Sequence, residues 1–384
     1  MRLPRALGHD PATTPVAVVF GGPSAEHDVS VVSGSAIADA LVGGGYPVGR
    51  HVVDLAGSWW ELPADHRRDD RPPGAYDDPA ALGARGPVAG GEVLSGLAGR
   101  DPRPVVFLAL HGPFGEDGTV QALVEAAGLA YTGSGVTASA IGMDKAIFKR
   151  LVRGLGLPVV DWREIPALRW RREPEAVLAE LSAFAAATGN ERLMIKPARL
   201  GSSVGMTLAH GPAERPGALE LAFRYDDLAL AERYLAGARD LEVSVIGNAW
   251  DALELYGPGE ILAGHEFYDF AAKYVPGLSE TTVTAEVGER ERATLLKLAR
   301  DAFRAIGADG FARVDFLLAG DALVVSEINT IPGFTPISLF PAMAAAGGYD
   351  FAGVCARIVD LALERHAARR RPTLTAAELY RDAS

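Results

Sequence analysis

Two short strand-like segments near the end of the chain carry residues suited to binding a metal ion. They are Arg313-Val-Asp315 and Glu327-Ile-Asn329, joined by a hairpin-like turn at Asp321. Side chains two residues apart on a strand face the same side, so each pair shares a face. Carboxylate and amide oxygens are hard ligands for a Mg²⁺ ion that bridges nucleotide phosphates. The pattern predicts a metal site at Asp315, Glu327 and Asn329, with a structural Arg–carboxylate pair as the alternative.

A glycine- and serine-rich loop follows another strand-like segment. It reads Lys196-Pro-Ala-Arg-Leu-Gly201-Ser202-Ser203-Val-Gly205. Small residues let backbone N–H groups approach phosphate oxygens, and the hydroxyls add donors. The lysine precedes the glycines and no Gly-Lys-Ser/Thr helix start follows, so this is not a Walker A motif. We predict a phosphate-binding loop, and a flexible hairpin is the alternative.

Lysine is scarce in this chain. Only five of the 37 lysine and arginine residues are lysines: Lys145, Lys149, Lys196, Lys273 and Lys297. A compact ammonium group suits phosphate oxygens, and arginine does not simply replace it. Three of the lysines, Lys145, Lys196 and Lys273, lie in loop-like segments and are expected to bind phosphate. Lys149 and Lys297 are expected to be surface charges. The distribution indicates a phosphate-handling enzyme, although genome composition can also produce the scarcity.

The loop from Asn329 to Ser338 leaves the second strand of the acidic pair. Gly333 can offer an unhindered N–H group to a developing oxyanion. Ser338 stands near an expected helix start, where a substrate carboxylate would be favourable. The alternative for Ser338 is a simple helix cap.

The order of apolar segments predicts three structured regions. Residues 15–142 begin strand–helix–strand, which indicates an α/β unit with a parallel sheet. Within it, residues 61–103 are rich in Pro, Gly and charge and are expected to form a loop insertion. Residues 143–238 are expected to be a small α+β region, and residues 239–366 a strand-rich region with two long helices.

Both ends of the chain are expected to lie outside the folded regions. Residues 1–14 are predicted to be a disordered lead-in, and residues 367–384 a loose tail. The start has no apolar stretch of signal-peptide length, and no run approaches a membrane span.

Composition narrows the class of protein further. The 384 residues carry a net charge of −12, which argues against a nucleic-acid partner. The single cysteine, Cys355, cannot form an internal disulfide and fits a reducing, cytoplasmic location. A soluble enzyme that acts on small molecules remains.

Seven segments, in order, resemble motifs of the D-alanine:D-alanine ligase family of the ATP-grasp superfamily. They are GGPSAEHDVSVVSG, HGPFGEDGTVQ, YTGSGVTASAIGMDK, KPARLGSSVGM, EFYDFAAKY, ARVDF and EINTIPGFTPIS. The resemblance covers about residues 15–365. It implies an α/β protein with an ATP-grasp fold, in which two α+β subdomains clasp ATP, preceded by an N-terminal Rossmann-like parallel-sheet domain. It also implies a homodimer.

The resemblance assigns residues to the nucleotide and its metal ions. Asp315, Glu327 and Asn329 would bind two Mg²⁺ ions, with Mn²⁺ as a possible substitute. Glu232 would face adenine, and Glu242 the ribose. The remaining nucleotide contacts implied are the phosphate lysines Lys145, Lys196 and Lys273, the loop residues Ser202 and Ser203, the hinge residues Arg233, Tyr234 and Leu235, and Phe267.

Further residues are assigned to the amino-acid substrates. Glu26 would hold the ammonium group of the first D-alanine, with His111 nearby. Arg313 and the Gly333 N–H would stabilise the oxyanion. The remaining assignments are Ser338 and Leu339, on the carboxylate of the second substrate, and Ser202 and Tyr274, hydrogen-bonded with Glu26. Plainer alternatives are an exposed acid near a helix start for Glu26, a loop brace for His111 and a packing residue for Tyr274.

The implied reaction uses ATP to convert one D-alanine into an acyl phosphate, which the amine of a second D-alanine attacks. Residues 200–205 and 265–285 are the expected lids over this intermediate. D-Alanyl-D-alanine would serve peptidoglycan synthesis. Tyr274 favours an amine nucleophile, because ligases that make D-alanyl-D-lactate have Phe or His there. One alternative is a ligase for D-serine, D-lactate or another amino acid, in resistance or natural-product biosynthesis. Another is a nucleotide-binding regulator without turnover.

Overall fold

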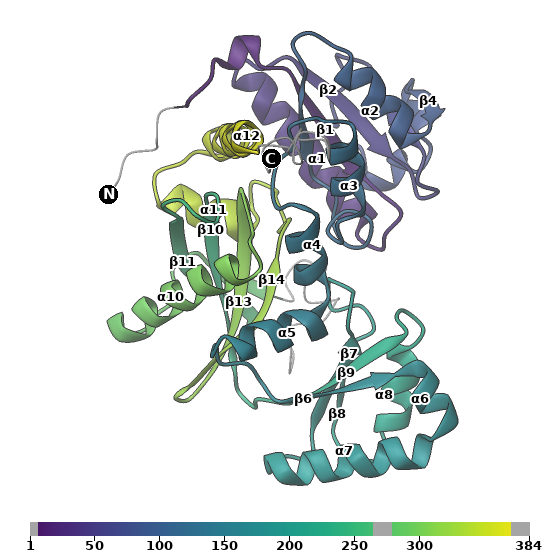
Figure 1. The fold of residues 1–384 in the computed structure, drawn as a ribbon, viewed down its shortest axis with the longest axis vertical. Helices are drawn as coiled ribbons and strands as arrows, with labels where there is room; N and C mark the ends of the chain where they lie inside the picture. The colour runs from purple at the N-terminus through teal and green to yellow at the C-terminus, as the bar shows by residue number, and fades with distance from the viewer. Residues whose placement is uncertain (1–6, 264–278, 370–384) are drawn as a thin grey trace, which may run out of the picture.

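The computed structural model describes residues 7–263 and 279–369. Its described strands form three sheets, and in Figure 1 the purple N-terminal segment lies at one end of the long axis, the green-yellow segment in the middle and the teal segment at the other end. The ribbon shows the expected α/β architecture, with an N-terminal domain followed along the chain by two α+β units (Figure 1).

The N-terminal sheet has the strand order β4-β3-β2-β1-β5, in which β1 pairs in parallel with β2 and β5. The strands β1 and β5 are short apolar runs that are buried along their whole length, as parallel strands usually are. The elements here are β1 (Val16–Gly21), α1 (His27–Gly43), β2 (Val48–Val53), β3 (Trp59–Glu61), β4 (Arg85–Val88), α2 (Gly90–Ala98), β5 (Val105–Leu108) and α3 (Thr119–Ala126), with 3-10 turns at Pro11–Thr13, Pro73–Tyr76 and Pro79–Leu82.

The expectation of a loop insertion over residues 61–103 is wrong. The segment contributes β4, which pairs antiparallel with β3 and extends the sheet, and the helix α2. Tyr76, Leu94 and Leu97 anchor it in the core of the N-terminal domain. Several of the residues that suggested a loop lie within these elements, Gly86 and Pro87 in β4 and Gly90 and Gly91 in α2. A few well-spaced apolar side chains supply the burial.

The central unit is an antiparallel sheet of order β6-β9-β7-β8, with helices packed on it. Its elements are β6 (Trp162–Pro166), α6 (Ala167–Arg172), α7 (Pro174–Thr188), β7 (Leu193–Pro197), β8 (Thr207–Ala209), α8 (Arg215–Ala222) and β9 (Leu228–Arg233). The loop between β7 and β8 is the glycine- and serine-rich segment, so this sheet positions the expected phosphate loop.

The third sheet has the order β12-β11-β10-β13-β14 and is antiparallel throughout. Its elements are β10 (Arg239–Ile246), β11 (Glu254–Ala263), β12 (Ser279–Thr282), α10 (Glu289–Ala305), β13 (Phe311–Ala319), β14 (Ala322–Asn329), α11 (Leu339–Ala346) and α12 (Phe351–Ala368). The linking helices α4 (Val136–Met143) and α5 (Lys145–Gly154) contact β14, and Phe148 and Val152 of α5 share the core formed by α10 and this sheet. The helix that carries Lys145 is therefore fixed on the third sheet.

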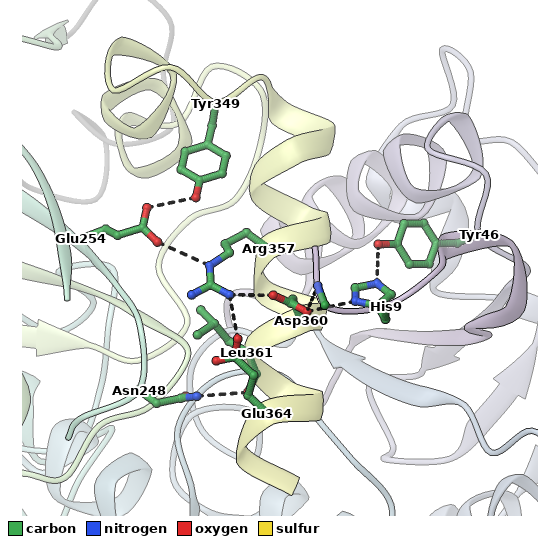
Figure 2. A network of polar contacts seen from close by, with 10 residues as sticks. His9, Tyr46, Asn248, Glu254, Tyr349, Arg357, Asp360, Leu361 and Glu364 are labelled. Atoms are coloured by element: carbon green, nitrogen blue, oxygen red, sulfur yellow. Dashed lines mark hydrogen bonds and ion pairs between the residues drawn. The ribbon is translucent and has the colours of Figure 1, made fainter. Parts of the chain in front are cut away.

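The last helix, α12, returns to the N-terminal domain. It contacts α1 and β5 and contributes to that domain's core. Figure 2 shows the polar side of this contact: Arg357 donates to Asp360 at 2.7 Å, and Asp360 accepts from the backbone N–H of Gly8 and contacts His9. Arg357 also lies 3.4 Å from Glu254, at the start of β11. Arg357 thus joins α12 to the third sheet, and Asp360 joins α12 to the segment before β1.

The predicted disordered lead-in and loose tail are wrong where the structure describes them. His9 is held between Asp360 and the hydroxyl of Tyr46, 3.1 and 2.8 Å away. At the other end, Arg369 pairs with Glu125 at 2.6 Å. Composition cannot predict such single polar contacts, because each depends on a partner far away in the sequence.

Candidate active site

Two adjoining cavities lie among the three sheets. One, of about 200 Å³, is lined by β7, β9, β10 and the glycine- and serine-rich loop. The other, of about 580 Å³, is lined by the start of α1, the loop after β5 and the loop after β14. Their shared wall contains Lys145, Gly201, Ser202, Glu242, Ile261, Arg313 and Glu327. A molecule in the first cavity would therefore meet one in the second at this wall.

Lys145 stands at the junction as the first residue of α5. Asp144 caps this helix, because its carboxylate accepts from the Ile147 N–H at 2.9 Å. The Lys145 ammonium donates to the Leu200 carbonyl at 2.9 Å and lies 3.1 Å from a carboxylate oxygen of Glu327. Burial opposes its charge, but Glu327, together with Glu232 and Glu26, outweighs burial and raises the pKa of Lys145. Lys145 thus ties the phosphate loop to the acidic strand.

The expectation that Lys149 is a surface charge is wrong. Its side chain is 0% exposed, and its ammonium lies 3.1 Å from one oxygen of Glu232. The other oxygen of Glu232 lies 3.0 Å from the ammonium of Lys196. Burial alone would raise the pKa of Glu232, but the two lysines outweigh burial and lower it. Lys149 follows Lys145 by four residues, a spacing that places both on one helix face, and this was the signal that could have found it.

The acidic residues meet as predicted, from adjacent strands. In the register of β13 and β14, Asp315 lies opposite Glu327, and Arg313 opposite Asn329. Arg313 donates to both oxygens of Asp315 at 2.7 Å, and the Asn329 amide donates to Asp315 at 2.9 Å. Arg313 also lies 3.2 Å from Glu242. Burial would lower the pKa of Arg313, but these carboxylates raise it well above its ordinary value.

The donor set at this hairpin fits a magnesium ion. Within residues 7–263 and 279–369, no group of three or more His, Cys, Asp or Glu side chains is arranged to hold a metal. Two opposed carboxylates and an amide oxygen are nevertheless what Mg²⁺ uses when substrate phosphates and water complete its coordination. Asp315, Glu327 and Asn329 are the residues that would hold it.

Glu26 occupies the N-cap position of α1 and is buried, rather than being an exposed acid. The Ser202 hydroxyl donates to its Oε1 atom, which joins the phosphate loop to the N-terminal domain. Ser202 and Ser203 hold positive φ angles of 51° and 56°, a conformation that is strained for residues other than glycine. The strain falls where the loop reaches across to Glu26.

His111 uses both of its ring nitrogens within the protein. Nδ1 lies 2.9 Å from the Ile331 carbonyl oxygen and so donates to it, while Nε2 lies 3.0 Å from the Ser33 hydroxyl. Ser33 in turn accepts from the Phe334 N–H. Burial lowers the pKa of His111, which favours this neutral tautomer. His111 lines the second cavity, but its hydrogen bonds match the alternative of a loop brace.

Glu116, in the HGPFGEDG segment, was not predicted as a site residue. Its two oxygens accept from the backbone N–H groups of Ile331 and Gly112, each at 2.9 Å. Burial, reinforced by the charge of Glu26, raises the pKa of Glu116 to about 8. His111 and Glu116 therefore hold the carbonyl and the N–H of the same residue, Ile331.

The loop after β14 brings Gly333 and Ser338 to the second cavity, together with Leu339, the first residue of α11. Ser338 is the N-cap residue of α11, but its side chain does not cap the helix. Its hydroxyl instead accepts from the Thr335 N–H at 3.0 Å. The simple-cap alternative is thus not what the structure contains.

The first cavity also collects the residues expected around adenine, namely Glu232, Arg233, Tyr234 and Leu235. Asp240 lines it too, two residues before Glu242 on the same face of β10, and was missed. Phe267, Lys273 and Tyr274 lie outside the described residues, as does most of the expected lid at 265–285. Among the described helices, none is both long and apolar enough to cross a membrane.

Comparisons with known proteins agree with this arrangement. Two family models match, "D-ala D-ala ligase N-terminus" over residues 15–134 and "D-ala D-ala ligase C-terminus" over residues 151–360. A D-alanine–D-alanine ligase of Heliobacterium modesticaldum is 39% identical, covering 93% of this chain and 96% of that protein. One of Kineococcus radiotolerans is 38% identical, with 91% and 96% covered.

Solved structures give the same result. The D-alanine–D-alanine ligase of Coxiella burnetii superposes with a TM-score of 0.75 at 31% identity, covering 93% of this chain and 95% of that one. The VanG D-Ala:D-Ser ligase of Enterococcus faecalis superposes with a TM-score of 0.77 at 28% identity, with 91% and 99% covered. The predicted family and fold class are confirmed: this chain belongs to the D-alanine–D-alanine ligase family.

Proposed function

We propose that the protein joins two D-alanine molecules into D-alanyl-D-alanine at the expense of ATP. The observation that carries this proposal is the meeting of a lysine-lined cavity with a cavity bounded by Glu26 and Ser338, with Arg313 in the wall between them. ATP in the first cavity would direct its γ-phosphate to this wall. The two amino acids would occupy the second.

The first step would form an acyl phosphate. Glu26 would hold the ammonium group of the first D-alanine, whose carboxylate oxygen attacks the γ-phosphorus and displaces ADP. Lys145 and Lys196 would bind the phosphates as point charges, together with Lys273. Asp315, Glu327 and Asn329 would hold Mg²⁺, or Mn²⁺ in its place. When bound, the metal would offset the charge on the phosphate oxygens.

The second step would form the peptide bond. Ser338 and Leu339 would bind the carboxylate of the second D-alanine, whose free amine attacks the acyl carbon. Arg313 uses Nε and Nη2 for Asp315, so Nη1 is the nitrogen that these bonds leave for the developing oxyanion, beside the Gly333 N–H. Collapse of the adduct breaks its C–O bond to phosphate, and the phosphate leaves with the proton that the amine gives up.

The acyl phosphate must be kept from water. The hydrogen bond from Ser202 to Glu26 supports a role for loop 200–205 as a lid, because it draws the loop over the junction of the two cavities. We further propose a cytoplasmic homodimer that serves peptidoglycan synthesis. The family supports the dimer, and the single buried thiol of Cys355 supports a reducing compartment.

A second candidate is a ligase with another second substrate, which the likeness to the D-Ala:D-Ser ligase favours. The test is phosphate release by purified protein with ATP, Mg²⁺ and D-alanine, alone or with D-serine or D-lactate. Rapid release with D-alanine alone, with dipeptide as product, is the expected result. Product only when D-serine or D-lactate is added would establish the alternative, and nucleotide binding without product would indicate a regulator.

A further inference from the structure

Lys149 is a buried lysine that the proposed reaction does not use. Its side chain is 0% exposed in α5, and its ammonium lies 3.1 Å from Glu232 Oε1. No second partner for this ammonium occurs among residues 7–263 and 279–369. A buried cation without a partner is strongly unfavourable, so its place in the fold depends on the Glu232 carboxylate.

Glu232 is shared between two lysines that differ in position. Its second oxygen lies 3.0 Å from Lys196, which lines the first cavity together with Glu232 itself. Lys149 is absent from the lining and lies behind the wall. One oxygen of Glu232 thus faces a lysine that a ligand can reach, and the other faces a lysine that a ligand cannot reach.

The ion pairs of Glu232 would change when a polyphosphate enters the first cavity. Phosphate oxygens compete with Glu232 for the Lys196 ammonium, as the proposed function requires. If Lys196 were its only cation, Glu232 would be left as a buried, uncompensated carboxylate, and releasing Lys196 would be costly. Lys149 removes this cost, because it remains beside Glu232 throughout.

We propose that Lys149 is a positioning residue, the permanent counterion of Glu232 that frees Lys196 to bind nucleotide phosphates. The inference rests on the proposed ATP site. It also explains why this helix carries a second lysine in a chain that otherwise prefers arginine: the fully buried space beside Glu232 takes a slender ammonium side chain.

The test is a comparison of ADP affinity, measured calorimetrically with Mg²⁺, among matched full-length variants. Lys149→Met keeps the side-chain length but removes the charge, so Glu232 should retain Lys196 and ADP should bind about tenfold more weakly. The double variant Lys149→Met with Glu232→Gln removes both charges and frees Lys196, so it should bind ADP as well as Glu232→Gln alone does. Lys297→Met is the control, since Lys297 pairs with Asp301 on the surface and should leave ADP affinity unchanged.

If Lys149 and Glu232 form an ion pair that only stabilises the fold, the variants should behave differently. Lys149→Met would then have a lower unfolding temperature without a change in ADP affinity, and that outcome would overturn the inference while leaving the proposed function intact. A double variant that binds ADP about tenfold more weakly than Glu232→Gln alone would overturn it too, because Lys149 would then act without Glu232. If Lys149→Met does not fold, Lys149→Gln and the double variant carry the same comparison. Wild-type protein that binds no ADP would instead overturn the proposed function, and the inference with it.

Discussion

The Nδ1 atom of His111 lies 2.9 Å from the carbonyl oxygen of Ile331, 220 residues away in the sequence. This bond joins the N-terminal domain to the loop that carries Gly333. The N–H of Ile331 is held from the same domain by Glu116. The position of the Gly333 N–H is thereby set by side chains that belong to another domain.

Replacing His111 by Ala should therefore impair the reaction more than the binding of nucleotide. Loss of a buried hydrogen bond of this kind costs about 1–3 kcal/mol, and we expect kcat to fall about tenfold or more. ADP affinity should be unchanged, because the first cavity is untouched. A higher KM for D-alanine at an unchanged kcat would show instead that His111 binds substrate directly.

Glu116 gives the stability a pH dependence. Burial raises its pKa to about 8, whereas the unfolded chain releases this proton near the ordinary value of 4.5. Between these two pH values the folded state holds a proton that the unfolded state has lost. The contribution of Glu116 to the free energy of unfolding is therefore fully present below about pH 4.5 and disappears as the pH rises through about 8. The unfolding temperature of the wild type, measured from about pH 6 to pH 9, should fall by about 2 °C for each kcal/mol of unfolding free energy that is lost.

The matched variant for that series is Glu116→Gln, which has no proton to release. Its unfolding temperature should fall less steeply than that of the wild type over the same pH range. Parallel curves for the two proteins would contradict the assignment.

Gly112 should not tolerate a side chain. It has a φ of 74°, and an added Cβ would lie 2.4 Å from Oε2 of Glu26. Gly112→Ala should displace the carboxylate and raise the KM for D-alanine, with a loss of about tenfold or more in kcat/KM. Gly91→Ala in α2 is the control, because an added Cβ there meets nothing within 4 Å. Equal steady-state constants for the two variants would exclude this packing around Glu26.

Arg357 should matter for stability rather than for chemistry. Its side chain is 2% exposed and bonds Asp360 and Glu254 (Figure 2). Arg357→Met leaves these acids without their cation and should cost about 3 kcal/mol or more of unfolding free energy, measured by urea titration. The surface variant Arg85→Met, which removes a pair with Glu61, should cost about 1 kcal/mol or less. Similar losses in both would refute the importance of the α12 network.

The sequence was informative where function depends on local pattern. Strand alternation predicted that Asp315 and Glu327 converge, and the run of glycine and serine residues predicted the loop after β7. The roles of Lys149 and Glu116 could not be predicted in this way, because each depends on a partner brought close only by the fold, Glu232 and Ile331. The 61–103 segment was misread for the same reason: its core contacts come from a few residues, such as Tyr76, whose neighbours are distant in sequence.

The acyl-phosphate route can be tested most directly with D-alanine labelled with ¹⁸O in its carboxylate. In the proposed mechanism a carboxylate oxygen attacks the γ-phosphorus and leaves with the phosphate, so each phosphate released with the dipeptide should carry one ¹⁸O atom. The label can be measured by mass spectrometry of the phosphate. Dipeptide formation with unlabelled phosphate would contradict the acyl-phosphate intermediate, and phosphate release without any dipeptide would contradict the ligase activity itself.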